Sequence, residues 1–279
     1  MLCDLHTHTN FSDGVLTPIQ LIDKSSAFGL STIAITDHDS TLAFTEAHQY
    51  GLKNNIDVIS GVELSASVGD YEAHILGYFI NPNDKYLLQT LDDFRHARKT
   101  RAFKIVEKLN NLGAKINIDD LLPNENETKS VGAIGRAHIA RKLVASGFVK
   151  NFSDAFRDYI GNDGPAFVPK PHFTIHETVE LIANAGGVSF LAHPGRNIEE
   201  ITLHTIVKSG IDGIEVYHPS HKKYVERFYH SLAKEKNMLI SGGSDFHGGG
   251  NHEEENLGKF GVSIPQLNKI KMLAETRKK

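Results

Sequence analysis

The stretch Leu2-Cys3-Asp4-Leu5-His6-Thr7-His8 joins a short apolar run to two histidines at positions i and i+2. If the run is a strand, its alternation turns both imidazoles to the same face, where they can bind one metal ion. Five further apolar runs carry or end in a histidine or an acidic residue. They are Thr36-Asp37-His38, Gly61-Val62-Glu63, Glu72-Ala73-His74, Ala192-His193-Pro194 and Ser244-Asp245-Phe246-His247. The repetition predicts that polar side chains gather at the strand ends of one sheet.

Short β-branched runs alternate with longer helical patterns along the chain. The expected strands cover residues 2–6, 32–36, 58–64, 73–79, 188–192, 213–217 and 238–241. The expected helices cover residues 18–28, 41–54, 174–185, 201–209, 222–235 and 265–275, with Thr17 and Thr174 as N-caps. This alternation predicts an α/β fold with a largely parallel, barrel-like sheet. No GxGxxG or GxxxxGK[ST] motif follows the first strand, which argues against dinucleotide and P-loop sites.

A long interruption separates the fourth and fifth expected strands. It contains helical patterns at residues 92–112, 137–148 and 151–159, and it ends in a return rich in glycine and proline. We interpret residues 84–172 as a small, mainly helical insertion domain. Residues 1–83 and 173–279 would then form the barrel domain.

Composition excludes several classes of protein. The chain has 279 residues, of which 40% are apolar, and no apolar run approaches the roughly 18 residues that a membrane span needs. The N-terminus lacks a secretory pattern, and the single cysteine, Cys3, excludes a disulfide scaffold and a thiolate zinc site. A net charge of −4 argues against a basic face for duplex DNA. We therefore expect a cytoplasmic protein that has no membrane association and no obligate protein partner.

Histidine is frequent, with 16 residues in 279. In a parallel α/β barrel the carboxyl ends of the strands meet at one mouth, so distant motifs converge there. One such histidine alone is more often a core or surface residue, but five strand ends of this kind have no comparable explanation. Burying these groups without partners is costly, and divalent cations remove that cost. The candidate ligands are His6, His8, Asp13, His38, Glu63, His74, His193, Asp245 and His247.

Mixed imidazole and carboxylate donors favour particular metals. Without thiolates, such a set suits manganese, zinc or iron better than an all-oxygen cage for magnesium or calcium, with magnesium as a further candidate. Nine donors are enough for several ions. We also expect Asp37 to orient one of the ligand imidazoles.

The ordered motifs, with Ser12-Asp13-Gly14 after the first, resemble those of the PHP (polymerase and histidinol phosphatase) domain family over about residues 1–250. The resemblance implies a distorted (β/α)7 TIM-like barrel with three metal ions. It implies one ion held by His6, His8, Glu63 and Asp245, a second by Glu63, His74 and His193, and a third by Asp13, His38 and His247. Many family members carry histidine where this chain has Asp13.

Other motifs resemble one branch of that family, which acts on nucleoside 3′,5′-bisphosphates and on the 5′ ends of short RNA. They are Gly135-Arg136-Ala137-His138, Val168-Pro169-Lys170 and Ala192-His193-Pro194-Gly195-Arg196. The resemblance implies that these cations bind the phosphate that is not cleaved, because guanidinium matches phosphate bidentately. Candidate substrate-binding residues are Arg136, His138, Lys170, Arg196, His218 and His221, and either of the last two could also act as an acid.

These observations predict a metal-dependent hydrolase. Two ions about 3.5–4 Å apart lower the pKa of a bridging water and hold the attacked phosphorus in place. We expect Glu63, Asp245 and His193 to be the catalytic residues. The expected reaction removes the 3′-phosphate of a nucleoside 3′,5′-bisphosphate such as adenosine 3′,5′-bisphosphate (pAp), and short single-stranded RNA is a related substrate. Alternatives are a histidinol-phosphate or general phosphomonoesterase and a carbonyl-attacking amidohydrolase. From another class, the alternative is a non-catalytic metal-binding regulatory module.

Overall fold

The computed structural model describes residues 2–121, 134–169, 173–248 and 255–278. Its strands are β1 (Leu2–Thr7), β2 (Thr32–Ile35), β3 (Asp57–Val68), β4 (Tyr71–Tyr78), β5 (Phe173–Thr174), β6 (Val188–Leu191), β7 (Gly213–Tyr217), β8 (Leu239–Gly242) and β9 (Val262–Ser263). The helices around these strands are α1 (Pro18–Ala27), α2 (Phe44–Lys53), α6 (Ile175–Asn184), α7 (Glu200–Lys208), α8 (Lys223–Glu235) and α10 (Ile264–Arg277).

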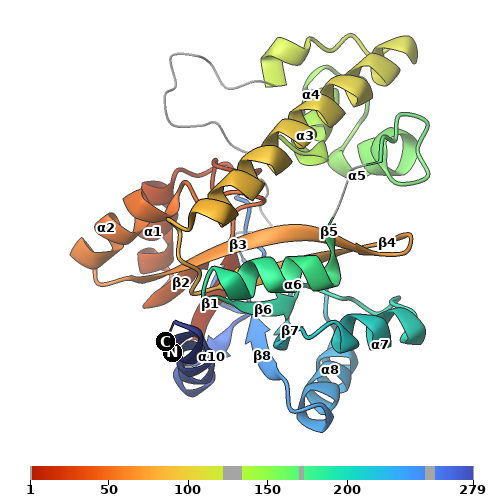
Figure 1. The fold of residues 1–279 in the computed structure, drawn as a ribbon. Helices are drawn as coiled ribbons and strands as arrows, with labels where there is room; N and C mark the ends of the chain where they lie inside the picture. Colours follow the sequence, from red (N-terminus) through yellow and green to blue (C-terminus); the bar gives the residue numbers. More distant parts are fainter. Residues whose placement is uncertain (1, 122–133, 170–172, 249–254, 279) are drawn as a thin grey trace.

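The strands form one sheet in the order β8-β7-β6-β4-β3-β2-β1-β9, with β5 paired to β3. An isolated parallel bridge between Thr7 and Phe246 joins the segment after β8 to β1, so the sheet nearly closes into a barrel. Figure 1 shows the helices on the outside of this barrel. The predicted α/β fold, a distorted TIM-like barrel, is confirmed.

β4 departs from the parallel arrangement, because it runs antiparallel to both of its neighbours, β3 and β6. β3 and β4 form a long hairpin in which Ser65 pairs with His74. Because β4 is reversed, its first half lies where the parallel strands finish. His74 therefore reaches the mouth of the barrel without standing at the carboxyl end of its strand.

Two helices begin at their predicted caps. Thr17 and Thr174 each form a capping box, at the start of α1 and α6 respectively. Gly29 and Gly186 follow the same two helices with φ values of 75° and 77°, a conformation that favours glycine. These local signals fix where the chain turns back toward the sheet.

Between β4 and β5 the chain forms a mainly helical unit. It contains α3 (Lys85–Asn111), the 3-10 turn η1 (Ile118–Leu121), α4 (Arg136–Ala145), α5 (Phe152–Ala155) and the π-helical turn η2 (Phe156–Ile160). α3 begins before the expected residue 92, because Asp84 accepts a hydrogen bond from the Leu87 N–H (2.8 Å) and caps it. α3, α4 and α5 lie together on one side of the barrel (Figure 1).

This helical unit has a hydrophobic cluster of its own, to which Ile105 on α3 and Leu143 on α4 belong. The barrel helices pack on other clusters. We propose on this basis that residues 84–172 form an insertion domain carried by a barrel of residues 1–83 and 173–279.

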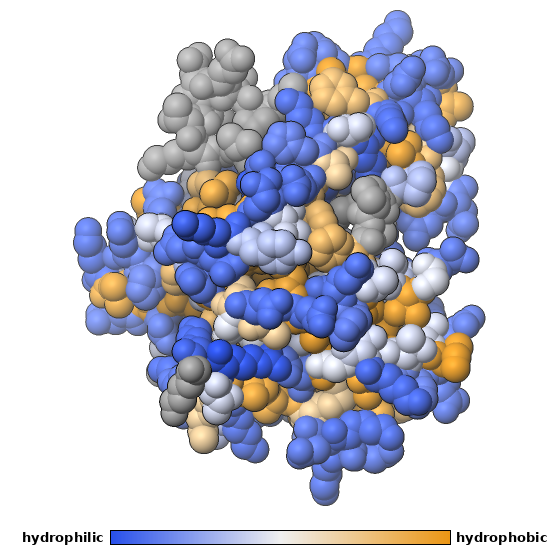
Figure 2. Space-filling model, in the orientation of Figure 1, coloured by the Kyte–Doolittle hydropathy of each residue, from blue (hydrophilic) through white to orange (hydrophobic). Residues whose placement is uncertain are grey.

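The surface is mostly hydrophilic on the face shown in Figure 2, with apolar side chains in scattered groups. Within the described ranges, no helix combines the length and the apolar character needed to span a bilayer.

Candidate metal centre

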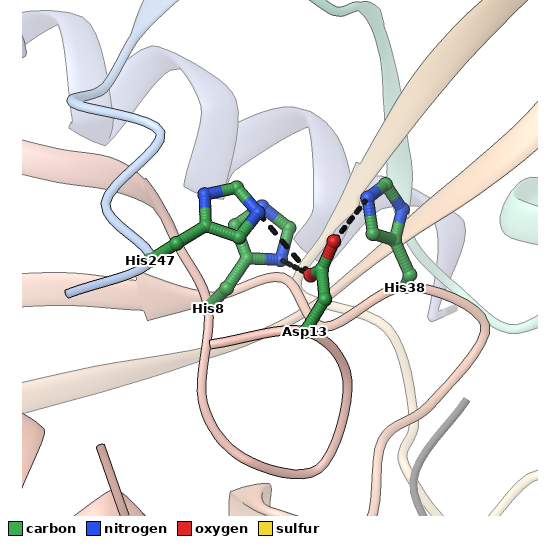
Figure 3. Close-up of side chains that lie close together, drawn as sticks. All are labelled: His8, Asp13, His38 and His247. Carbon is green, nitrogen blue, oxygen red and sulfur yellow. Dashed lines mark ion pairs between the residues drawn. The ribbon is translucent and has the colours of Figure 1, made fainter. Parts of the chain in front are cut away.

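The nine candidate ligands meet at the mouth of the barrel. The donor atoms of eight of them form three groups in which all atoms lie within 4.8 Å of one another: His6, His8, Glu63 and Asp245; His8, Asp13, His38 and His247; and His38, Glu63 and His74. The ninth, His193, lies 3.1 Å from Oε1 of Glu63. Figure 3 shows the second group, with the Asp13 carboxylate between the imidazoles of His38 and His247. The structure therefore brings together residues that are up to 241 positions apart in the sequence.

Glu63 is the centre of the cluster and is only 1% exposed. Its Oε2 lies 3.3 Å from the Nε2 atoms of both His6 and His8, and 3.2 Å from Nδ1 of His38. Its Oε1 lies 2.8 Å from Nδ1 of His74 and 3.1 Å from Nε2 of His193. Five imidazoles thus surround one carboxylate, which gives Glu63 the geometry of a bridging ligand.

The backbone is unusual at these strand ends. His193 and Asp245 adopt positive φ values of 25° and 53°, which are costly for residues other than glycine. At Gly243 a Cβ atom would lie 2.3 Å from Cβ of His6, so only glycine lets the segment after β8 approach β1. The strain is located where the ligands must be aimed.

The donor set passes a test for a bound cation. Nε2 of His8, Nδ1 of His38 and Nδ1 of His74 are buried and make no hydrogen bond of normal geometry. The separations of 3.2–3.3 Å among the donors of the first group match the roughly 3.3 Å expected for tetrahedral ligands about 2.0–2.1 Å from an ion. Buried nitrogens without partners are rare, so these atoms fit a metal ion.

The pKa values of the cluster residues are also compatible with a bound cation. Burial lowers the pKa of His38 to about 3, so this imidazole is neutral and able to bind a cation. Burial would also lower the pKa of His247, but the Asp13 carboxylate outweighs it and raises that pKa to about 10, so His247 has to release a proton when it binds a cation. The pKa of Glu63 is held well below its usual range by the surrounding imidazoles, in spite of burial. The carboxylates are therefore ionised at neutral pH.

Glu215 on β7 belongs to the site, and the sequence analysis missed it. Nδ1 of His6 donates to its Oε1 (3.0 Å), and the His193 N–H donates to its Oε2 (2.7 Å). This carboxylate, which is fully buried, fixes two candidate ligands at once. A glutamate in the middle of the apolar strand Gly213–Tyr217 was the signal that could have identified it.

Asp37 has a different role from the one we expected. It accepts hydrogen bonds from the Thr9 N–H (2.7 Å), the Thr9 hydroxyl (2.6 Å) and the Ser12 hydroxyl (2.7 Å). It approaches a ligand imidazole only through Ser12, whose Oγ lies 3.5 Å from Nδ1 of His8. Asp37 therefore holds the loop that carries Asp13.

Three arginines lie beside the metal cluster, and only Arg136 was expected there. Arg136 donates a hydrogen bond to Asn162 (2.8 Å) and lies 3.6 Å from Glu72 on β4. Arg98 on α3 donates a hydrogen bond to the buried Asp39. In spite of burial, the carboxylates of Asp39 and Asp13 favour the charged form of the Arg98 guanidinium and raise its pKa.

The third arginine, Arg101, donates to the Val168 carbonyl (2.7 Å) and keeps one buried Nη2 without a hydrogen bond. Burial and the neighbouring Arg136 lower its pKa to about 10. Arg98 and Arg101 lie in a polar stretch of α3 whose sequence is typical of a solvent-exposed helix face. The sequence therefore did not identify them as site residues. Together the guanidinium groups of Arg98, Arg101 and Arg136 form a compact cationic site, which we call the arginine site.

The remaining candidates fall in different places. His138 accepts a hydrogen bond from the Gly135 N–H (3.1 Å), and burial lowers its pKa. Nε2 of His218 lies 3.4 Å from Asp245. His221 donates to the Val216 carbonyl (2.9 Å) and accepts from the Gly195 N–H (3.1 Å). Arg196 is exposed, and its guanidinium lies 3.5 Å from the Tyr224 hydroxyl. Lys170 lies outside the described residues.

Comparison with known proteins adds independent information. The family model described as the PHP domain matches residues 4–162. The 3′,5′-nucleoside bisphosphate phosphatase of Chromobacterium violaceum is 34% identical over 253 residues, which is 88% of this chain and 87% of the relative. The 5′-3′ exoribonuclease Rnm of Escherichia coli is 31% identical over 255 residues, 88% and 85% of the two chains. A crystal structure of a metal-dependent phosphoesterase from Bifidobacterium adolescentis superposes with a TM-score of 0.88 at 31% identity, covering 97% and 95% of the chains.

Replacing Glu215 by glutamine tests its positioning role. Glutamine keeps one acceptor oxygen but loses the charge that favours metal binding by His6, so the affinity for Mn²⁺ should fall about 10–100-fold. Calorimetric titration of chelator-treated protein measures this affinity. Glu180→Gln, on the exposed face of α6, is the matched control and should bind as the unchanged protein does. Equal affinities for all three proteins would contradict the role of Glu215.

Proposed function

Because the chain belongs to the PHP domain family, we propose that it is a metal-dependent phosphoesterase that hydrolyses the 3′-phosphate of nucleoside 3′,5′-bisphosphates. The observation that carries this proposal is the pairing of two sites. A ligand cluster suited to divalent cations lies next to three buried or half-buried arginines from the insertion. One site suits the phosphate that is cleaved, and the other suits a second phosphate on the same molecule.

We propose that three ions occupy the cluster. His6, His8, Glu63 and Asp245 would hold one, Glu63, His74 and His193 a second, and Asp13, His38 and His247 the third. Manganese, zinc or iron fits these donors best, with magnesium as a further candidate. Bound there, the ions would activate a water and neutralise charge on the phosphoryl oxygens.

The protein's own residues then position the reaction. Glu63 would contribute one carboxylate oxygen to each of two of these ion sites, and Asp245 and His193 aim their donors through a strained backbone. Glu215 fixes the imidazole of His6 and the backbone of His193. Nε2 of His218 faces Asp245 at 3.4 Å, and its Nδ1 is held by the Ser220 hydroxyl (2.7 Å), so His218 orients that carboxylate.

The arginine site selects doubly phosphorylated substrates. In the described part of the chain its three guanidinium groups have only two carboxylate partners, Asp39 and Glu72, so a phosphate dianion adds charge-assisted hydrogen bonds there. Arg101 has an Nη2 free to donate, and Arg136 lies at the start of α4 with part of its surface open. The 5′-phosphate of a nucleotide fits this role, because the scissile 3′-phosphate occupies the metal cluster.

The same arrangement suits the 5′ end of a short RNA, whose first internucleotide phosphate stands where the 3′-phosphate of pAp does. The names of the relatives, a bisphosphate phosphatase and a 5′-3′ exoribonuclease, agree with both substrates. In each case the product is a nucleoside 5′-phosphate.

Product analysis of the purified protein tests the proposal. With Mn²⁺, pAp should yield AMP and inorganic phosphate, while histidinol phosphate should be a poor substrate. Asp245→Asn removes the charge of a proposed metal ligand. Changing a residue that only supports a ligand costs up to about 100-fold in activity, so this variant should lose more than that in kcat. Efficient cleavage of histidinol phosphate with pAp left intact would contradict the substrate assignment. An unchanged rate for Asp245→Asn would favour a non-catalytic metal-binding module.

Removing Arg136 tests the second phosphate site. Arg136→Ala loses charge-assisted hydrogen bonds of about 1.5–3 kcal/mol, so KM for pAp should rise about 10–100-fold. KM for p-nitrophenyl phosphate, which has one phosphate, should stay within about twofold by the same argument. The control is Arg157→Ala, whose side chain is 66% exposed on the same insertion. Equal losses on both substrates would remove the proposed role.

A further inference from the structure

A rigid segment of backbone leads away from the metal cluster after β6. It begins at His193, whose N–H is held by Glu215 (2.7 Å), and continues through Gly195. The Gly195 N–H donates to Nε2 of His221 (3.1 Å), and its carbonyl accepts from the Tyr229 hydroxyl (2.8 Å). The segment ends at Arg196, so the position of this arginine relative to the ligands is fixed by the fold.

Beyond Arg196 lies a groove between α7 and α8, with a volume of about 650 Å³. On α8, Tyr224, Phe228 and Leu232 recur every four residues and form one wall, and Leu203 and Val207 of α7 form the other. Tyr224 and Phe228 remain 45% and 55% exposed. Figure 2 shows apolar side chains at the surface over α7. The groove thus presents aromatic surface to solvent next to the catalytic site.

The rim of the groove carries one positive charge suited to a phosphate. The guanidinium of Arg196 lies 5.9 Å from the centre of the Tyr224 ring and 3.5 Å from its hydroxyl. Among the described residues its polar contacts are with Tyr224, and none is an ion pair with a carboxylate. Glu200 lines the same groove, and Glu235 at the far end is paired with Lys236 (2.8 Å). A phosphate is therefore favoured only at Arg196, and the interior favours an uncharged planar group.

The arginine site and the groove both adjoin candidate ligands of one Glu63 oxygen. Arg136 contacts Glu72, two residues before His74, whereas Arg196 follows His193 by three residues. His74 and His193 both contact Oε1 of Glu63, at 2.8 and 3.1 Å. A chain of nucleotides with its 5′-phosphate at the arginines and its next phosphate at the metal cluster would continue toward Arg196.

We propose that the groove between α7 and α8 binds the base of the second nucleotide of an RNA substrate, while Arg196 binds the phosphate on its 3′ side. Stacking on aromatic side chains accepts any base. This inference rests on the proposed function and assigns short RNA, in addition to pAp, as a substrate. In the reaction, water adds to the scissile phosphorus, the bond from phosphorus to the 3′ oxygen breaks, and that oxygen takes a proton. The first nucleotide leaves with a 3′ hydroxyl, and the remaining RNA keeps a 5′-phosphate in place for the next round.

The test compares a 5′-phosphorylated RNA trinucleotide with pAp, which has no second base. Phe228→Ala removes one stacking surface worth about 1–3 kcal/mol, so KM for the trinucleotide should rise at least about fivefold. KM for pAp should stay within about twofold. Phe28→Ala is the matched control, because Phe28 is 48% exposed at the end of α1, away from the groove. It should change neither KM.

A binding measurement completes the test without turnover. In the full-length Asp245→Asn protein with Mn²⁺, a trinucleotide carrying 4-thiouridine at its second position should cross-link to residues of α7 or α8. If wild-type protein hydrolyses pAp and the trinucleotide but Phe228→Ala changes neither KM, or if cross-links form elsewhere, the groove does not bind RNA although the proposed function stands. If wild-type protein hydrolyses neither compound, the proposed function and this inference both fail.

Discussion

The structure depends on a buried carboxylate, Glu63, surrounded by five imidazoles at 2.8–3.3 Å. An ionised carboxylate at this depth is costly unless positive charge compensates it. Divalent cations shared among these donors would supply that charge, and would replace protons on the imidazoles. The barrel therefore has to hold strand ends from distant parts of the chain at fixed spacing, and glycine at position 243 and left-handed backbone at His193 and Asp245 follow from this requirement.

A second layer of carboxylates makes the arrangement rigid. Glu215 links His6 to the backbone of His193, and Asp4 accepts N–H groups from His6 (3.3 Å), Ser244 (2.9 Å) and Gly258 (3.1 Å). These contacts join β1, β6, β7 and the segment after β8. The insertion adds function to this frame, because its arginines place positive charge beside a cluster that suits phosphate chemistry.

The ligands were predictable because their chemistry is visible in short motifs. His6 and His8 stand at i and i+2 of a strand, and most other ligands end an apolar run, so convergence at a barrel mouth follows from topology. His74 was identified for an incomplete reason, since its strand runs antiparallel and brings it to the mouth from its first half. Glu215, Arg98 and Arg101 were missed, because their roles arise from contacts across more than 50 residues that no local pattern encodes. The groove between α7 and α8 was missed for the same reason.

Anomalous X-ray diffraction from crystals grown with Mn²⁺ tests the central claim most directly. The account predicts three peaks. Two should be bridged by the Glu63 carboxylate, one next to His6 and Asp245 and the other next to His74 and His193, and the third should lie among Asp13, His38 and His247. Maps without a transition-metal peak within bonding distance of Glu63 would contradict it, because five imidazoles would then surround a carboxylate for a reason other than metal binding.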